Sequence, residues 1–184
     1  MRRRPVLETE RLILRAPDHR DFTAFAAMMA DADHTRFMGG RQSAQAARRS
    51  LAGTVESWAG RGWGMFAVIE KTTGRWVGQV GPWRPVDQPE LWPGDEIGWA
   101  LSRRDSGRGY ALEAAAAAID FAFGTLGWTD VIHCIDPEDH RSVRLAERLG
   151  SLRLGPVDCP APYDRRVSIA WGQTREAWQG RRAA

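Results

Sequence analysis

The stretch between residues 96 and 126 constrains the fold of this chain more than any other segment. Residues 96–101 form an apolar run of strand length, Gly107 and Gly109 follow, and an apolar stripe at helical spacing begins at Leu112. A strand therefore runs into a glycine turn that opens a helix. Glycine lets the backbone come close to a ligand, and the free N–H groups and dipole of a helix N-terminus favour an anion. The segment predicts either a phosphate cradle or a tight strand-to-helix turn that needs glycine for its geometry.

The residues in and around this turn help to distinguish a phosphate cradle from a purely structural turn. Arg104 and Arg108 add mobile positive charge suited to phosphate oxygens. The turn is not a P-loop, because the Lys-Ser/Thr pair is missing after the second glycine, and it lacks the GxGxxG spacing of a dinucleotide-binding turn. From the glycines alone, the cradle and the structural turn are about equally supported.

Hydrophobic periodicity predicts one α+β domain over residues 1–184, with a largely antiparallel sheet and a strand–helix–strand unit at its centre. Seven strands are expected, at residues 12–15, 65–69, 76–80, 96–101, 131–135, 153–154 and 167–171. Four helices are expected, one after a cap at Asp18, one over 43–60, one from about 110 to 126 and one over 142–149.

Composition and charge exclude several classes of protein. The net charge of +3 is spread along the chain without a run of five or six basic residues, so no nucleic-acid partner is expected. Cys134 and Cys159 are read as reduced thiols that imply no metal site. No apolar run reaches the roughly 18 residues of a membrane helix. Residues 1–4 look like the start of a signal peptide, but Pro5, Glu8 and Glu10 interrupt it, so a cytoplasmic protein is expected.

The glycine turn also resembles a known motif. Arg104-x-x-Gly107-x-Gly109 is similar to the Arg/Gln-x-x-Gly-x-Gly/Ala motif of the GNAT superfamily of acetyl-coenzyme A N-acetyltransferases. Further blocks resemble that family's RimJ/RimL-type branch, with residues 7–15 at its opening, 96–99 in its fourth strand, 109–114 in the next helix and 137–150 in its last motif. The resemblance implies the GNAT fold, a central mostly antiparallel mixed sheet of about seven strands with splayed strands four and five, flanked by about four helices.

The resemblance further implies an enzyme that moves the acetyl group of acetyl-coenzyme A to a primary amine by direct transfer in a ternary complex. Coenzyme A would lie in the gap between strands four and five. Backbone N–H groups around Ala100, Leu101 and Ser102 would bind the pantetheine and polarise the thioester carbonyl. The following loop and the last motif would hold the rest of the cofactor through Arg103, Arg104, Ser106, Gly107, Arg108, Gly109, Tyr110, Ala111, Asp139 and Arg148.

Two positions depart from the family pattern. Asp139 stands where the family usually has Asn, which removes an amide donor and adds negative charge near an anionic cofactor. Ser151 replaces the usual aromatic residue after Gly150, so the packing under the last helix is expected to differ.

Glu96 is the first choice for a general base that deprotonates the acceptor, directly or through water. The period of two in a strand puts Glu96 on one face with Gly98 and Ala100, and small residues beside a carboxylate leave room for a substrate. The alternative is an ordinary solvated acid at the end of a strand.

Stabilising the leaving thiolate needs another group. Many GNAT enzymes use a Tyr in the last motif, but the matching position here is Ala146. Ser142 matches a Ser of the RimJ/RimL-type branch, and its hydroxyl could donate a hydrogen bond to the sulfur. An N-cap is the commonest role of Ser at a helix start, and the two roles do not exclude each other.

The acceptor is expected to be the α-amine of a protein or peptide, or a small amine. Trp83, Trp92 and Trp99 surround the loop before residue 96 and predict a lip that binds a cationic, partly apolar acceptor. Core packing or a dimer interface explains these Trp residues equally well, so a homodimer stays open. A non-catalytic acyl-coenzyme A-binding regulatory module is the alternative function, since the Tyr is missing and Asp139 departs from the pattern.

Overall fold

Every strand in the described part of the chain belongs to one mixed sheet. The computed structural model describes residues 4–85, 89–160, 163–164 and 167–183, so most of the basic stretch that looked like a leader lies outside it. The strands are β1 (Leu7–Glu8), β2 (Leu12–Arg15), β3 (Phe66–Glu70), β4 (Trp76–Trp83), β5 (Glu96–Leu101), β6 (Asp130–Ile135), β7 (Leu152–Val157) and β8 (Ser168–Thr174). Their order in the sheet is β1-β2-β3-β4-β5-β6-β8-β7, and only the β5–β6 pair is parallel. The sheet thus has eight strands, one more than expected, because the two-residue β1 pairs with β2.

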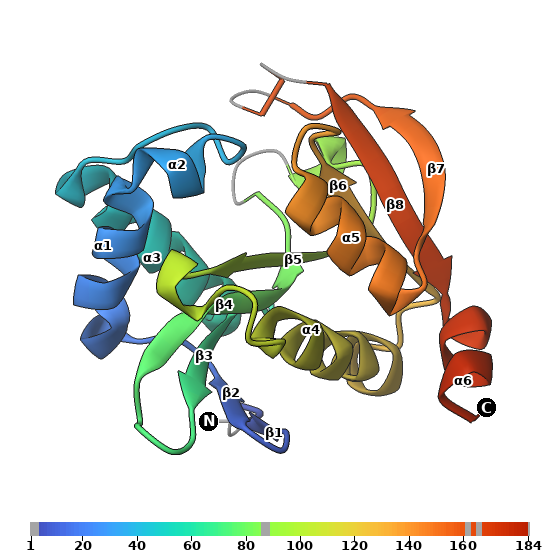
Figure 1. Ribbon diagram of the computed structural model, residues 1–184, viewed down its shortest axis with the longest axis horizontal. Helices are drawn as coiled ribbons and strands as arrows, with labels where there is room; N and C mark the ends of the chain where they lie inside the picture. The colour runs from blue at the N-terminus through green and yellow to red at the C-terminus, as the bar shows by residue number, and fades with distance from the viewer. Residues whose placement is uncertain (1–3, 86–88, 161–162, 165–166, 184) are drawn as a thin grey trace.

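Helices cover both faces of this sheet (Figure 1). They are α1 (Phe22–Ala30), α2 (Ala32–Thr35), α3 (Ala44–Gly60), α4 (Tyr110–Phe121), α5 (His140–Leu149) and α6 (Arg175–Ala183). Short 3₁₀ turns span His19–Asp21, Pro89–Leu91 and Arg103–Asp105, and a π-helical turn over Ala122–Leu126 extends α4. None of the described helices has the length and apolar character needed to cross a membrane.

Two of these helices were not expected from the sequence. α2 is a single turn whose N-cap Asp31 accepts hydrogen bonds from the backbone N–H groups of Asp33 and His34. α6 buries only Trp178, so its sequence shows almost no apolar stripe that could predict a helix. The helix at residues 43–60 is confirmed, with Ser43 as its N-cap.

The two faces of β5 differ in the way that the strand period predicted. Ala100 packs with Phe25 and Leu51 of α1 and α3, whereas Ile97 belongs to the core cluster that contains the buried residues of α4. α4 lies across β4 and β5 (Figure 1). Glu96 and Ala100 therefore share the α1–α3 face of β5, and Ile97 lies on the α4 face.

β5 and β6 separate soon after they meet. Their only register pair is Glu96 with Ile132, whose N–H donates to the Asp95 carbonyl at 2.9 Å. Beyond this pair, side chains rather than backbone groups make the hydrogen bonds between the two strands. The N–H of Cys134 donates to Glu96 Oε1 at 3.1 Å, and the His133 ring bonds to the Ile97 carbonyl at 2.7 Å. The splayed strands implied by the family resemblance are β5 and β6, and the Glu96 carboxyl lies where they part.

Candidate functional site

The gap between β5 and β6 opens into a cleft of about 2190 Å³. Its walls come from the separated strands, from α2 and α3, from the turn before α4, from the start of α5 and from the loop between β7 and β8. Residues from distant parts of the sequence therefore meet around the Glu96 carboxyl. The cleft is large enough for an extended ligand and a second reactant.

Glu96 is a buried carboxyl rather than a solvated one. The residue is 7% exposed, and its Oε2 accepts a hydrogen bond from Trp92 Nε1 at 2.7 Å while Oε1 accepts from the N–H of Cys134. Burial raises the pKa of Glu96 to about 8, although both hydrogen bonds favour the charged form. The alternative of an ordinary strand-end acid is therefore wrong. The group can hold or release a proton near neutral pH.

Trp92 helps to set the protonation of Glu96, and this gives a testable prediction. In Trp92→Phe, the carboxylate loses the indole donor, so the pKa of Glu96 should rise further. Any pH-dependent rate controlled by Glu96 should then shift its midpoint upward by about 0.5–1 pH unit. Trp83→Phe is the matched control, because no hydrogen bond joins Trp83 to Glu96 among the described residues. A midpoint that stays in place or falls in Trp92→Phe would refute this role of Trp92.

The three Trp residues do not form one lip. Trp83 and Trp92 pack edge to face with ring centroids 4.6 Å apart, and Tyr163 packs against both at 5.3 and 5.5 Å. These three rings line the cleft beside Glu96 as an aromatic wall. Trp99 lies apart from them and packs on His133 at 4.6 Å. The expectation of a single Trp lip is wrong because successive side chains of β5 alternate between its two faces.

His133 belongs to a buried polar chain under α5. Its Nδ1 donates to the Ile97 carbonyl, so its Nε2 accepts from the Ser151 hydroxyl at 3.1 Å. Gln173 Nε2 donates to the same hydroxyl oxygen at 3.2 Å. Burial lowers the pKa of His133 to about 4, which keeps the ring neutral. Ser151, which stands where the family pattern has an aromatic residue, completes the hydrogen bonds of this buried chain.

The start of α5 shows why Asp139 stands in place of Asn. Asp139 is the N-cap and accepts from the N–H of Ser142 at 3.2 Å and from its hydroxyl at 2.8 Å. Trp99 Nε1 donates to the Ser142 hydroxyl oxygen at 3.1 Å. Of the two roles considered for Ser142, the N-cap is wrong, because Asp139 is the N-cap and its two carboxylate oxygens accept from the backbone N–H and the hydroxyl of Ser142. Ser142 lines the cleft, and its hydroxyl oxygen lies between Asp139 and Trp99, with a hydrogen bond to each.

The turn before α4 has free backbone donors. Gly107 and Gly109 have φ of 79° and 82°, which only glycine adopts without strain. The first helical bond runs from the N–H of Glu113 to the Gly109 carbonyl at 3.1 Å. The N–H groups of the preceding residues have no partner within the helix. Gly107, Gly109, Tyr110 and Ala111 all line the cleft, as does Ser106.

The arginines of this turn are held by acids rather than mobile. Arg108 pairs with Glu70 at 2.8 Å and with Asp105 at 3.5 Å, which corrects the expectation of a free guanidinium. Arg104 lies 3.7 Å from the same Asp105 carboxylate. Neither side chain is among the residues that line the cleft. Arg103 lines the cleft and pairs with Asp33 at 2.6 Å.

A buried network fixes the turn to the β3–β4 hairpin. Arg75 donates to both oxygens of Asp105 at 2.8 and 2.9 Å, and Asp105 is 1% exposed. Arg75 also bonds to Glu70, which accepts a hydrogen bond from the Tyr110 hydroxyl. These ion pairs therefore stabilise the turn. The groups of the turn that can bind a ligand are its backbone N–H groups.

The backbone N–H groups of β5 point alternately toward β4 and toward β6. Ser102 donates to the Val77 carbonyl of β4 at 2.9 Å, so its N–H is not available in the gap. Donors alternate along an antiparallel strand, so the N–H of Ala100 also points toward β4. The N–H groups of Trp99 and Leu101 point toward β6. Of the three residues expected to offer N–H groups to the pantetheine, only Leu101 has its donor on the open edge.

Comparison with known proteins identifies the family. Residues 11–151 match the model of the acetyltransferase (GNAT) domain. The chain belongs to the GNAT acetyltransferase family. It is 31% identical over 147 residues to the Bacillus subtilis (strain 168) protein YkkB, covering 78% of this chain and 83% of that one. An acetyltransferase from Agrobacterium tumefaciens has the same fold with a TM-score of 0.80 and 29% identity, covering 93% of this chain and 95% of that one.

A second solved structure of the same fold contains coenzyme A. It is an aminoglycoside acetyltransferase in complex with the cofactor, with a TM-score of 0.74, 19% identity and coverage of 93% of this chain and 99% of that one. The turn before α4 of this GNAT domain suits an anionic group, because its left-handed glycines line the cleft and the N–H groups of the first helical turn have no partner within the helix. These residues could hold the diphosphate of coenzyme A.

Several cleft residues of this acetyltransferase were missed by the sequence analysis. Tyr163 and Cys159 reach the cleft from the irregular segment between β7 and β8, and His34 reaches it from α2. Cys159 hydrogen-bonds to Cys134, which lowers the pKa of the Cys159 thiol to about 7 and raises that of Cys134. Both cysteines are free thiols. No periodic pattern marks these positions, so sequence alone offered no signal for them.

Proposed function

We propose that this chain transfers the acetyl group of acetyl-coenzyme A directly to a primary amine, with Glu96 as the general base. The observation that carries the proposal is a carboxyl buried at the point where β5 and β6 part, with a pKa raised to about 8. An α-amine has a pKa of about 8. A base and an acid of matched pKa exchange a proton with little free-energy cost, so Glu96 suits an α-ammonium acceptor.

Different residues of the cleft are proposed to carry out different parts of the reaction. Bound acetyl-coenzyme A supplies an acetyl group activated as a thioester. Glu96 takes a proton from the acceptor ammonium, directly or through one water, and leaves a neutral amine beside the aromatic wall. The N–H groups of Trp99 and Leu101 lie on the open edge of β5, where they can donate to a carbonyl oxygen. The hydroxyl of Ser142, whose oxygen accepts from Trp99, is proposed to turn its proton from the Asp139 carboxylate to the departing thiolate and so stabilise it.

The cofactor is proposed to lie along the turn before α4. Backbone N–H groups from Gly107 to Ala111 would bind its diphosphate, and Arg103 and Ser106 line the same part of the cleft. Asp139 acts through Ser142 and the start of α5 rather than by contact with the cofactor. Residues 1–184 are taken as one catalytic domain.

The acceptor is proposed to be the α-amine of a protein or peptide, or a small amine with an apolar part. Trp83, Trp92 and Tyr163 offer aromatic surface beside the base, which suits a cation next to an apolar group. The motifs shared with the RimJ/RimL-type branch favour a peptide α-amine. Incubation with isotope-labelled acetyl-coenzyme A and cell extract, followed by mass spectrometry, tests this. Labelled acetyl groups on primary amines are expected, and labelling that the active protein does not increase would refute the proposal.

A further inference from the structure

The two cysteines of this chain meet in the cleft, although they come from separate elements. Cys134 of β6 pairs with Ala170 of β8 in the sheet. Ser168, at the start of β8, pairs with Val157 at the end of β7. Cys159 follows Val157 by two residues, and its thiol hydrogen-bonds to the Cys134 thiol and to the Ser168 hydroxyl. Both cysteines and Ser168 line the cleft, so a small molecule that enters it can reach the thiols.

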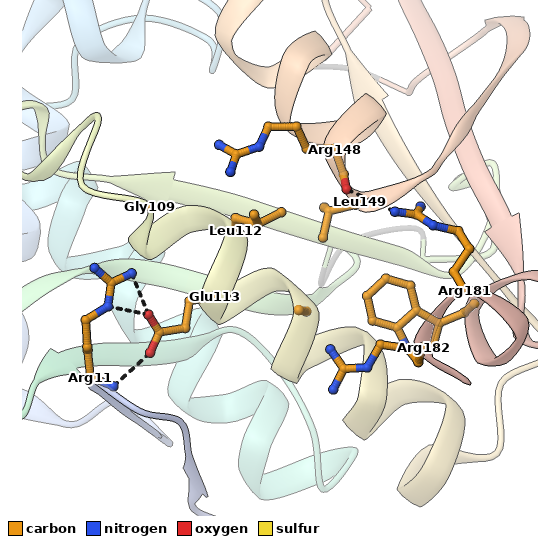
Figure 2. A pocket seen from close by; sticks show the side chains of 10 residues that line it. Arg11, Gly109, Leu112, Glu113, Arg148, Leu149, Arg181 and Arg182 are labelled. Carbon is orange, nitrogen blue, oxygen red and sulfur yellow. Dashed lines mark hydrogen bonds and ion pairs between the residues drawn. The ribbon is translucent and has the colours of Figure 1, made fainter. Parts of the chain in front are cut away.

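A second cavity differs from the cleft in its chemistry. It has a volume of about 410 Å³ and opens where α4, α5 and α6 meet (Figure 2). None of the described residues that line it is a cysteine, and the ion pair of Arg11 with Glu113 lies at one side of it. Arg148 lines both this cavity and the cleft. Chemistry that uses the thiols is therefore restricted to the cleft.

The two thiols of the pair differ in reactivity. The hydrogen bond from the Cys134 thiol, together with that from the Ser168 hydroxyl, lowers the pKa of the Cys159 thiol. The same bond, together with burial and the nearby Glu96 carboxyl, raises the pKa of the Cys134 thiol. Cys159 is thus the thiol that ionises, and Cys134 keeps its proton beside it. An accessible thiolate next to a second thiol is the arrangement of an attacking and a resolving cysteine.

We propose that Cys134 and Cys159 form a redox modification site, at which a hydroperoxide closes an intramolecular disulfide that reversibly inhibits acetyl transfer. The Cys159 thiolate attacks the peroxide, an S–O bond forms as the O–O bond breaks, and the departing oxygen takes up the proton that the thiol had released. The Cys134 sulfur then attacks the resulting sulfenic acid. An S–S bond forms, the S–O bond breaks, and the leaving hydroxide takes the Cys134 proton as water. The two thiols are oxidised to a disulfide, and the peroxide is reduced to an alcohol and water.

This disulfide would act on Glu96 from two sides. The backbone N–H of Cys134 donates to Glu96 Oε1. Tyr163, in the same irregular segment as Cys159, packs on Trp92, whose indole donates to Glu96 Oε2. A covalent bond is shorter than a contact between thiols, so closing it draws this segment toward β6 and displaces both supports of the carboxyl. The inhibition rests on the proposed function of Glu96, whereas formation of the disulfide does not.

Treatment of the full chain with hydrogen peroxide tests the proposal, and intact-mass analysis gives a readout that does not depend on activity. Wild-type protein is expected to lose the mass of two hydrogen atoms and its reactivity toward a maleimide. Digestion without reductant should yield one linked pair of peptides, which contain Cys134 and Cys159. The formation of acetylated amine should fall at least about tenfold, since a misplacement of about 1 Å at reacting groups can cost about 100-fold in rate. Dithiothreitol should restore both the thiols and the rate.

Serine variants separate the roles of the two thiols. Cys134→Ser keeps the attacking thiol without the resolving one, so it should accumulate a sulfenic acid on Cys159 that dimedone traps. Cys159→Ser should stay unmodified at the same dose of peroxide, because Cys134 keeps its proton. The double variant Cys134→Ser/Cys159→Ser is the control for oxidation of other residues. Its rate, whatever the starting value, should not change with peroxide.

The outcomes distinguish this proposal from the proposed function. Wild-type protein that forms no disulfide, or forms one only between molecules, overturns the redox site. A Cys159→Ser variant that reacts with peroxide as fast as wild type also overturns it. A disulfide that leaves acetyl transfer at the rate of the reduced protein overturns the inhibition. If reduced wild type acetylates no amine, the proposed function fails, and the linked peptides still decide whether the disulfide forms.

Discussion

Replacing Glu96 with glutamine is expected to lower kcat/KM for an amine acceptor by at least about 100-fold, the usual contribution of a general base. Glutamine keeps the size of the side chain and one acceptor for the Trp92 and Cys134 donors, but it cannot take a proton. The loss should be largest for acceptors that are fully protonated at the assay pH. Release of free thiol from acetyl-coenzyme A, measured with a primary amine, gives the rate.

Two controls make this result specific. Asp130→Asn removes an exposed carboxylate at the start of β6 and should leave kcat/KM within about twofold, as expected for a surface substitution. The affinity of Glu96→Gln for acetyl-coenzyme A should stay close to that of wild type, because the proposed cofactor contacts lie elsewhere. A Glu96→Gln variant that keeps a tenth or more of wild-type activity would show that another group, or water alone, deprotonates the acceptor.

The stability of the protein should fall as pH rises through the range in which Glu96 is protonated only in the folded state. The pKa of Glu96 is about 8 in the fold against 4.5 for the free side chain. Between these values the folded state holds a proton that the unfolded chain has released, so the free energy of unfolding decreases with rising pH. Each pH unit contributes about 1.4 kcal/mol, and the full interval corresponds to a loss on the order of 5 kcal/mol.

Urea unfolding of wild type and Glu96→Gln between pH 5 and pH 9 measures this effect. Other titrating groups are common to both proteins, so they largely cancel in the difference between the two free energies. The free energy of unfolding of Glu96→Gln is expected to increase relative to that of wild type as pH rises. This holds whatever constant difference its altered hydrogen bonds cause at pH 5. A difference that does not change with pH would mean that Glu96 titrates near its ordinary pKa.

The elements that form the site's frame were predictable because local patterns specify them. Alternation along residues 96–101 placed Glu96 and Ala100 on one face of β5 and Ile97 on the other, as the packing confirms. Gly107 and Gly109 marked the turn into α4, since both need left-handed backbone angles. The family followed from the order and spacing of motifs, and the domain model over residues 11–151 confirms it.

What the sequence did not predict depends on contacts between distant residues. The acids that hold Arg108 include Glu70, which lies 38 positions earlier in the chain, so the guanidinium looked free. The role of Asp139 as N-cap depends on where α5 begins, and helix starts are weakly specified by sequence. α6 buries one side chain, and its position became clear only from its contacts with α4 and α5.

The rate of thiol release from acetyl-coenzyme A, followed from pH 6 to pH 9 with and without a peptide that carries a free α-amine, tests the central claim most directly. We predict release that requires the peptide, that rises with a midpoint near pH 8, and that is nearly lost in Glu96→Gln. Binding of acetyl-coenzyme A with no amine-dependent release from any of a panel of peptides and small amines would contradict it. That result would instead favour a non-catalytic acyl-coenzyme A-binding module.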